Sequence, residues 1–224
     1  LGRNGPLAGQ RVIVTAGPTR EPLDPVRFIS NPSSGKQGFA LAQAAVDYGA
    51  QVTLITGPTH LPTPVGVQRI DVTTAEDMLN AVLPVCREAD VLLMAAAVGD
   101  YSPATVAPQK IKKTEAGLTL RLERTPDILA LVAEQRVLSG KPRVVVGFAA
   151  ESEHLVDHAR AKLTAKRLDL IVANDVMARD AGFAAETNRV VLVDREGRVE
   201  PLPLMSKAAV AKLILDRVVK QLGE

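Results

Sequence analysis

The chain has 224 residues, enough for one large domain with a substantial core or for a domain with a small appendage. A hydrophobic content of 46%, a charged content of 23% and a net charge of +2 are ordinary for a globular protein, and they argue against a basic surface for nucleic acid or membranes. The aromatic content of 3% argues against base stacking on single strands.

Cys86 is the single cysteine, which excludes an intramolecular disulfide and a Cys-based zinc site. Its place in an amphipathic helical pattern predicts a buried packing role. We find neither a secretory signal nor a long apolar span, so we expect a cytoplasmic protein. The chain begins at Leu1 without Met, and we therefore expect that an N-terminal partner domain is missing from it.

Strand and helix patterns alternate over the first 96 residues. We predict strands over residues 12–15, 51–56, 67–72 and 91–96, and helices over 35–48 and 74–88. Gly49 is placed to end the first helix, and Thr73 and Thr74 before Glu76 and Asp77 give a capping-box signature for the second. This alternation predicts an α/β fold with a doubly wound, mostly parallel, Rossmann-like sheet and right-handed crossovers.

The pattern changes after Tyr101. Residues 102–117 are polar and rich in Pro and Lys, and residues 118–123 alternate with period two, so we predict a projecting flap over 102–124. A helix should follow, with Pro126 in its first turn. Further along the chain we predict a strand over 143–148, a helix over 151–167, a strand over 168–172, a hairpin of 188–194 with 199–204, and a helix from the cap Ser206 to Gln221. We treat residues 1–224 as a single domain.

The segment between Thr15 and Phe39 is unusually long for an α/β loop. It follows the first strand, where open α/β sheets bind ligands. Three glycines would allow close backbone approach and three cations would supply charge: Gly17, Gly35, Gly38, Arg20, Arg27 and Lys36. The segment therefore predicts a site for an anionic ligand.

Two common phosphate-binding motifs do not match this segment. A dinucleotide fold needs Gly-x-Gly-x-x-Gly, but Gly17 is followed by Pro18 and the next glycine is Gly35. The Tyr-x-x-x-Lys pair of short-chain oxidoreductases fails because Thr105 stands where the lysine should be. A P-loop would need Gly at position 30 and Ser or Thr at position 37, and neither is present.

An acid and several lysines are better candidates for binding. Asp100 follows the small residues 95–99 at a strand end, where it could hold Mg²⁺ or simply cap a turn. The lysines of residues 110–113 could close over a phosphate, or form a solvated face. Lys162 and Lys166 lie one helical turn apart, so both point the same way. Together with Arg20, Arg27 and Lys36, these cations could form one cluster at the carboxyl ends of the strands around a highly anionic ligand, such as a nucleoside triphosphate with Mg²⁺.

Several ordered blocks resemble one family. They are Thr-Ala-Gly-Pro-Thr-Arg-Glu-Pro-Leu-Asp-Pro-Val-Arg-Phe-Ile-Ser-Asn, Ser-Ser-Gly-Lys-Gln-Gly, Ala-Ala-Ala-Val-Gly-Asp-Tyr, Lys-Ile-Lys-Lys, Pro-Asp-Ile-Leu, Gly-Phe-Ala-Ala-Glu, Lys-Leu-x-x-Lys-x-x-Asp-Leu-Ile-Val-Ala-Asn-Asp-Val and, before the last helix, Leu-Pro-Leu-Met-Ser-Lys. The chain resembles bacterial phosphopantothenoylcysteine synthetase, the second activity of a bifunctional coenzyme A biosynthesis flavoprotein, over essentially its whole length.

The resemblance implies a phosphopantothenate–cysteine ligase. In that family the carboxylate of 4′-phosphopantothenate attacks CTP, giving an acyl-cytidylate and pyrophosphate, and the amine of L-cysteine then displaces CMP. Some relatives use ATP, so the expectation of CTP rests on the family alone. Mg²⁺ is the implied metal. The resemblance also implies a homodimer, with the flap reaching across to or closing the partner's site.

The resemblance assigns roles to individual positions. Lys110 would act in acyl-cytidylate formation, Asn31 in the second step, and Arg27 in supporting that loop or binding substrate. The nucleotide and its metal would face Asp100 and the backbone of residues 94–96. The other implied contacts are Pro126, Asp127, Ile128, Leu129 and Phe148 around cytosine and ribose, and Lys162 and Lys166 at the triphosphate.

Two positions depart from the family pattern: Gly99 stands where Ala is usual, and Pro32 stands where His or Arg is frequent. The decarboxylase half of the bifunctional protein is not in the sequence, so we expect no flavin here. The alternatives are a binding or scaffolding domain with an inactive site, and a short-chain oxidoreductase.

Overall fold

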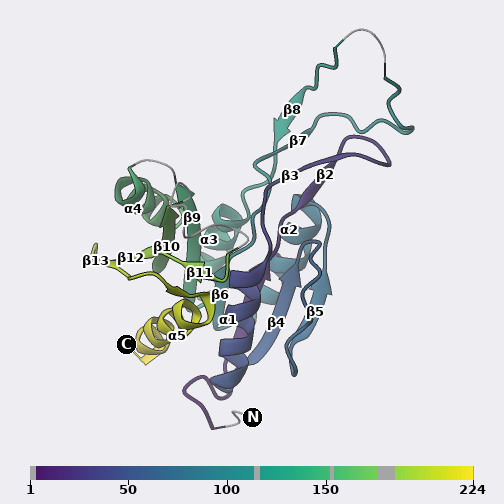
Figure 1. The fold of residues 1–224 in the computed structure, drawn as a ribbon. Helices are drawn as coiled ribbons and strands as arrows, with labels where there is room; N and C mark the ends of the chain where they lie inside the picture. Colours follow the sequence, from purple (N-terminus) through teal and green to yellow (C-terminus); the bar gives the residue numbers. More distant parts are fainter. Residues whose placement is uncertain (1–3, 114–116, 152–153, 176–184, 224) are drawn as a thin grey trace.

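The computed structural model describes residues 4–113, 117–151, 154–175 and 185–223. Its centre is one eight-stranded sheet (Figure 1). Six strands are parallel: β1 (Arg11–Ala16), β4 (Gln51–Thr56), β5 (Gln68–Asp71), β6 (Val91–Met94), β9 (Val144–Glu151) and β10 (Leu170–Asp175). Two further strands, β12 (Val190–Asp194) and β13 (Val199–Pro201), extend the sheet antiparallel beyond β10.

The strand order is β13-β12-β10-β9-β6-β1-β4-β5. From β1 the chain builds outward through β4 and β5, then returns to place β6 on the other side of β1 and continues through β9 and β10. The direction of winding therefore reverses between β1 and β6. This is the doubly wound α/β fold that the sequence predicts, and its ligand crevice is expected at the carboxyl ends of these two strands.

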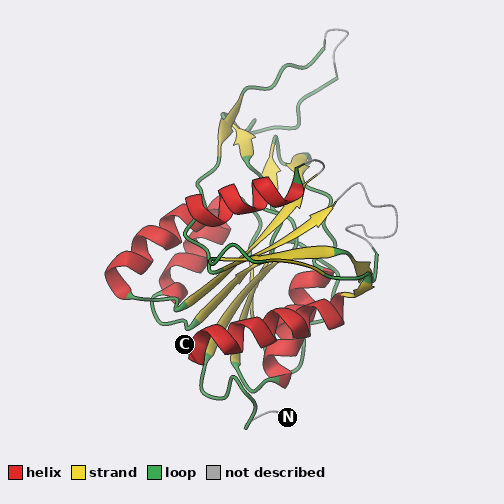
Figure 2. Ribbon diagram, turned by 90° about the vertical axis from the view of Figure 1, so that its left-hand side faces the viewer, coloured by secondary structure: helices red, strands yellow, loops and turns green. Residues whose placement is uncertain are grey.

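Helices cover both faces of the sheet (Figure 2). On one face lie α1 (Lys36–Asp47) and α5 (Lys207–Gly223), and on the other lie α2 (Ala75–Cys86), α3 (Ile128–Ser139) and α4 (Leu155–Ala165). A hydrophobic core lies on each face of the sheet, and successive strand residues contribute to the two cores in turn. Val12 and Val14 pack with α1 and α5, whereas Ile13 packs on the opposite side. None of the described helices has both the length and the apolar character needed to cross a membrane.

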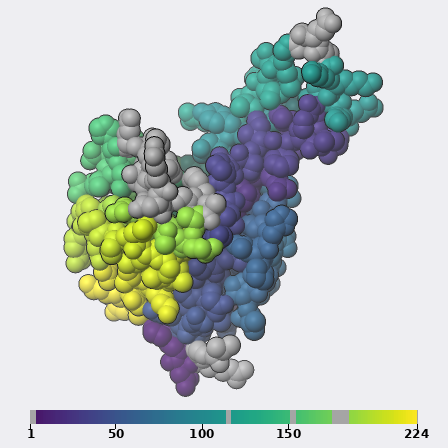
Figure 3. Space-filling model, viewed as in Figure 1, coloured from purple at the N-terminus to yellow at the C-terminus, as the bar shows by residue number. Residues whose placement is uncertain are grey.

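Two short hairpin-like pairs project from the carboxyl edge of the sheet. One joins β2 (Arg20–Pro22) to β3 (Phe28–Ser30), and the other joins β7 (Tyr101–Pro103) to β8 (Leu122–Arg124). Figure 3 shows them packed together as one projection. The predicted flap is confirmed, although its second strand covers only residues 122–124 and residues 114–116 lie outside the described part.

The structure corrects several local predictions. The segment after β1 contains the β2–β3 hairpin instead of a continuous loop. Pro126 lies before α3 and not in its first turn. The N-terminal cap of this helix is Asp127, whose side chain accepts a hydrogen bond from the N–H of Ala130. The helix expected from residue 151 begins at Leu155, because β9 continues to Glu151; residues 152 and 153 lie outside the described part.

One pairing in the carboxyl-terminal part is absent from the sequence-based prediction. Residues Thr187–Asn188, labelled β11, pair antiparallel with Met205–Ser206, labelled β14. Ser206 nevertheless caps α5 as expected, since its hydroxyl accepts from the N–H of Ala209 at 3.1 Å. Cys86 is fully buried, and burial raises the pKa of its thiol to about 12, consistent with the packing role.

Close contact between α1 and β1 supports the crevice. A Cβ added at Gly38 would lie 2.5 Å from Ala16 Cβ and 2.9 Å from the carbonyl oxygen of Thr15. We therefore expect Gly38→Ala to lower the free energy of unfolding by about 1–3 kcal/mol through overpacking. Urea denaturation would measure this. Gly117→Ala is the control, because nothing lies within 4 Å of its added Cβ; an equal loss in both variants would contradict the packing argument.

Candidate active site at the carboxyl edge of the sheet

Hydrogen bonds join the loops that follow β1 and β6. The hydroxyl of Thr15 accepts from the N–H of Ala96 at 3.1 Å, and that of Thr19 accepts from the N–H of Gly99 at 2.8 Å. Between them the N–H of Ala97 donates to Gly17 O at 2.9 Å. Both threonines are fully buried, so these bonds are shielded from water. They hold the backbone of the second loop in place at the switch point.

A cavity of about 540 Å³ opens beside these loops. Its volume falls within the range of roughly 300–1,000 Å³ that is usual for pockets binding small molecules. It is lined by Met94, Ala96, Val98, Gly99, Asp100, Tyr101, Arg124, Thr125, Pro126, Asp127, Ile128, Leu129, Phe148, Lys162 and Lys166. We call it the larger cavity. Every residue that the resemblance assigns to the nucleotide lines it, except Ala95 and Lys110.

The two lysines of α4 are held in position in the larger cavity. Lys162 donates from Nζ to the carbonyl oxygen of Phe148 at 2.9 Å. Lys166 forms an ion pair with Asp127. Although partial burial opposes ionisation of Asp127, its bonds to Lys166 and to the N–H of Ala130 hold its pKa below the ordinary value. The acid therefore stays charged at neutral pH and fixes the position of Lys166.

Asp100 lies at the rim of the larger cavity and is exposed. Among the described residues there is no group of three or more His, Cys, Asp or Glu that could hold a metal on its own. A single carboxylate fits Mg²⁺, which is usually bound by one or two carboxylates together with substrate phosphates. The donor set is thus compatible with the predicted metal role of Asp100.

A smaller cavity of about 130 Å³ lies next to the larger one. It is lined by Ser33, Ser34, Gly35, Lys36, Gln37, Gly38, Ala95, Ala96, Ala97, Phe148, Ala149, Ala150, Asn174, Asn188 and Lys207. The two cavities share Ala96 and Phe148. The segment predicted to bind an anion thus contributes Lys36, Gly35 and Gly38 to this cavity, which also contains the predicted contact Ala95.

Sequence reasoning gave Lys207 no role. The side chain is only 7% exposed, and it reaches the smaller cavity from the first residue of α5. The motif Leu-Pro-Leu-Met-Ser-Lys marks its position, but a lysine that begins an amphipathic helix usually lies in solvent. Only the packing of α5 against α1 brings it to the site.

The flap is anchored to the β2–β3 hairpin by a buried carboxylate. Asp24 pairs with Arg27, with Oδ2 and Nε 2.9 Å apart, and the same oxygen accepts from the N–H of Ile111 at 3.1 Å. Arg27 in turn donates to the carbonyl oxygen of Ile111 at 2.7 Å. The predicted catalytic residue Arg27 thus supports the flap next to Lys110, and neither residue belongs to the described lining of the two cavities.

Asn31 is exposed and lies where the hairpin returns to the crevice. Its Nδ2 donates to the carbonyl oxygen of Val98 at 3.1 Å, so its own carbonyl oxygen is directed away from that bond. Arg20 lies over the ring of Phe28, with the guanidinium carbon 4.6 Å from the ring centroid. Arg20 therefore belongs to the hairpin surface and does not belong to the described lining of either cavity, contrary to the prediction of one cation cluster.

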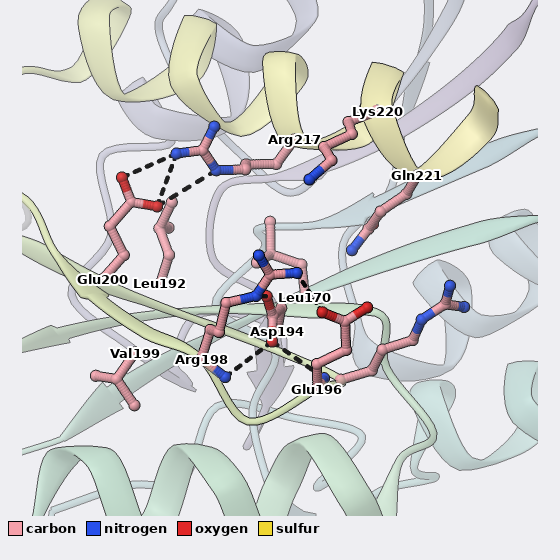
Figure 4. Close-up of a pocket in the computed structure, with 11 residues that line it drawn as sticks. Leu170, Leu192, Asp194, Glu196, Arg198, Val199, Glu200, Arg217, Lys220 and Gln221 are labelled. Carbon is pink, nitrogen blue, oxygen red and sulfur yellow. Dashed lines mark hydrogen bonds and ion pairs between the residues drawn. The ribbon is translucent and has the colours of Figure 1, made fainter. Parts of the chain in front are cut away.

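A third cavity of about 410 Å³ lies far from these loops, between the β12–β13 turn and α5 (Figure 4). Its arginines face carboxylates: Arg217 lies 2.8 Å from Glu200, and Arg198 lies 3.1 Å from Asp194. Leu170, which also lines it, begins β10, so this cavity is at the amino edge of the parallel strands. Its position at the amino edge, and the carboxylates that its arginines face, do not suit the predicted anion.

The fold and its crevice define a doubly wound α/β protein with adjoining binding cavities at the switch point. Comparison with known families gives a narrower assignment. Residues 7–222 match the family described as "DNA/pantothenate metabolism flavoprotein C-terminal domain", and the chain belongs to that family.

Relatives and solved structures agree with this assignment. The chain is 49% identical over 99% of its length to the coenzyme A biosynthesis bifunctional protein CoaBC of Bacillus subtilis, and 47% identical over 95% to that of Escherichia coli. It spans only 54% and 52% of those proteins. A crystal structure of the C-terminal domain of CoaBC is 39% identical with a TM-score of 0.83, covering 98% of this chain and 99% of that one.

A more distant structure shares the fold alone. It is a Cab2 variant in complex with phosphopantothenate-cysteine, 19% identical with a TM-score of 0.77. The match covers 96% of this chain and 86% of the Cab2 chain.

The anchor at Asp24 predicts how the flap responds to substitution and pH. We expect Asp24→Asn to raise the rate of trypsin cleavage after Lys110, Lys112 and Lys113 by about tenfold, because a charge-assisted anchor is lost. Glu134→Gln, on the exposed face of α3, is the control. Equal cleavage of Asp24→Asn and the unchanged chain would contradict the anchor.

The expected pH dependence follows from the same carboxylate. The hydrogen bond from Arg27 and three backbone N–H groups hold the pKa of Asp24 far below its usual range, despite burial. A lowered pKa means that the stabilisation is complete above about pH 4 and is lost as the pH falls toward the lowered value. Hydrogen exchange at the N–H of Ile111 should therefore lose protection below about pH 4.

Proposed function

We propose that this chain is a phosphopantothenate–cysteine ligase of coenzyme A biosynthesis. It would activate 4′-phosphopantothenate with CTP, releasing pyrophosphate, and couple the acyl-cytidylate to L-cysteine with release of CMP. The observation that carries the proposal is that all the residues assigned to the nucleotide by resemblance, except Ala95 and Lys110, line one cavity at the switch point. The identity to coenzyme A biosynthesis proteins supports it.

The charges in the larger cavity suit phosphoryl chemistry. Such reactions depend mainly on positioning and on stabilising charge on the phosphates. Lys162 and Lys166 would bind the triphosphate from one face of α4, and Asp100 would hold Mg²⁺. When bound, the metal would neutralise phosphate charge.

The nucleoside would lie against the apolar part of the same cavity. Ile128 and Leu129 are almost completely buried at the start of α3, and Phe148 lies in the middle of β9. We propose that these groups, with Pro126 and Asp127, frame cytosine and ribose, as the resemblance implies. Backbone groups would then select the base.

The hairpin and flap would complete the reaction centre. Arg27 and Asp24 fix Ile111, which places the neighbouring Lys110 on an anchored part of the flap. Lys110 would stabilise the charge that develops as the acyl-cytidylate forms. Asn31, whose amide nitrogen is engaged by Val98, would present its carbonyl oxygen to the cysteine step. In this scheme Arg27 is a positioning residue.

Two protein partners belong to the proposal. The relatives are bifunctional proteins about twice as long as this chain, and we propose that a flavin-dependent decarboxylase domain is fused to or associated with this chain, with no flavin bound in the part described here.

The flap and hairpin expose seven large apolar side chains, and we propose that this surface forms a dimer with a second copy of the chain. The seven are Val26, Phe28, Tyr101, Val106, Leu118, Leu120 and Leu122.

Pyrophosphate release tests the reaction. The chain incubated with phosphopantothenate, Mg²⁺ and CTP should release pyrophosphate stoichiometrically without cysteine and catalytically with it. Lys110→Gln should slow release about 100- to 1,000-fold, as expected for loss of a group that stabilises developing charge. Asn31→Ala should still release the first equivalent but slow CMP formation.

Lys220→Gln, on the far end of α5, is the matched control and should behave as the unchanged chain. Absence of pyrophosphate with both CTP and ATP, from a chain with a cooperative unfolding transition, would contradict the proposed function. Faster turnover with ATP would contradict only the choice of nucleotide.

Light scattering tests the dimer. Changing Leu118, Leu120 and Leu122 together to Ser should convert the dimer to a monomer, because the apolar area available for association is lost. Changing the exposed pair Val137 and Leu138 to Ser on α3 is the control and should leave the mass unchanged. A monomeric unchanged chain would contradict the proposed assembly.

A further inference from the structure

We propose that Thr125 is a positioning residue that holds Asp100 in place at the rim of the larger cavity. The inference rests on the proposed function for the metal and the nucleotide, and it goes beyond that function in naming the residue that fixes the carboxylate. Thr125 lies between the end of β8 and the start of α3, and it lines the same cavity. The resemblance assigns no role to this threonine.

Thr125 forms hydrogen bonds with the backbone on both sides of Asp100. Its hydroxyl donates to the carbonyl oxygen of Gly99 at 2.6 Å, and its N–H donates to the carbonyl oxygen of Asp100 at 3.0 Å. These carbonyl groups belong to the planar peptide groups that precede and follow the Cα atom of Asp100. Because a residue has only two soft backbone dihedrals, holding both peptide groups fixes the direction in which the side chain leaves the backbone.

The hydroxyl of Thr19 supports the same segment from the side of β1, one residue before Asp100. It accepts from the N–H of Gly99 at 2.8 Å. Gly99 stands where the family pattern has Ala, and without a Cβ it restricts the backbone less than alanine would. The bonds from Thr125 therefore extend the fixed part of the segment to the carboxylate itself.

Thr125 also joins Asp100 to the base of the flap. Asp100 directly precedes β7 and Thr125 directly follows β8, and the adjoining residues Tyr101 and Arg124 pair in antiparallel register. The N–H of Thr125 thus extends that ladder by one bond. Two residues later, Asp127 caps α3. The bonds from Thr125 to the segment around Asp100 therefore connect two walls of the larger cavity.

The hydroxyl group is what the first of these bonds requires. Valine has nearly the shape of threonine but cannot donate, so it would leave the carbonyl group of Gly99 without this partner, whereas serine keeps the donor. Removing the hydroxyl would release the peptide group that precedes Asp100. A metal held through that carboxylate would then be bound less tightly, as is usual when a group that orients a metal ligand is removed.

A double-mutant cycle with Asp100 tests the inference. CTP would be titrated calorimetrically, with Mg²⁺ and with EDTA, into the unchanged chain, Thr125→Val, Asp100→Asn and the double variant. We expect Thr125→Val to lower the affinity for CTP with Mg²⁺ about tenfold, and the affinity in EDTA by less than about twofold. In the Asp100→Asn background the same change should lower the affinity with Mg²⁺ by less than about twofold, because it acts through that carboxylate.

Further variants distinguish positioning from a general structural role. Thr125→Ser keeps the donor and should retain the affinity of the unchanged chain. Thr105→Val, at an exposed threonine of the flap, is the matched control and should also behave as the unchanged chain. If Thr125→Val lacks a cooperative unfolding transition, Thr125→Ala removes the same donor and takes its place. A loss of affinity that is equal with and without Mg²⁺, and additive with Asp100→Asn, would overturn the inference.

The remaining outcomes separate this inference from the proposed function. If Asp100→Asn weakens binding of CTP with Mg²⁺ but Thr125→Val does not, the inference is overturned and the function stands; the same holds if Asp100→Asn changes nothing. If only ATP binds with Mg²⁺, the cycle is measured with ATP. Failure of the unchanged chain to bind either nucleotide would overturn both proposals. The expected cycle without pyrophosphate release in the ligase assay would support the positioning role and contradict the proposed function.

Discussion

The hydroxyl groups of Thr15 and Thr19 hold the two loops at the switch point together. Each accepts a backbone N–H from the segment that follows β6, and the parallel bridge between Pro18 and Ala97 lies between them. A loop without such bonds would leave buried N–H groups unsatisfied, at a cost comparable to a lost hydrogen bond. The loop after β6 lines both cavities and the loop after β1 lines the smaller one, so the geometry of both cavities depends on these bonds.

The projecting arm is held in a different way. Polar contacts around Asp24 join its two parts, the flap and the β2–β3 hairpin, and its large apolar side chains are exposed. Segments with few buried apolar contacts open at low free-energy cost. The protein thus combines a crevice held by buried hydrogen bonds with a projection held by few buried contacts.

Lysine and arginine have separate uses in this molecule. Several arginines pair with carboxylates, as Arg217 does with Glu200 and Arg27 with Asp24. The lysines of the two cavities contact carbonyl oxygens or single carboxylates, as Lys162 contacts Phe148. The planar guanidinium group suits a bidentate carboxylate, whereas an ammonium group is a compact charge that can exchange one partner for a phosphate.

The sequence by itself determined the doubly wound fold, the flap and the order of the elements, because apolar periodicity and helix caps such as Thr74 are local signals. Its ordered blocks also marked the residues of the larger cavity. The hairpin at residues 20–30 and the start of α4 were not predictable, because both depend on pairing with distant segments. Tertiary structure alone decided that Arg27 supports the flap and that Lys207 enters the smaller cavity. The groups that a charged side chain contacts depend on packing between elements far apart in the chain, and a local sequence pattern does not specify that packing.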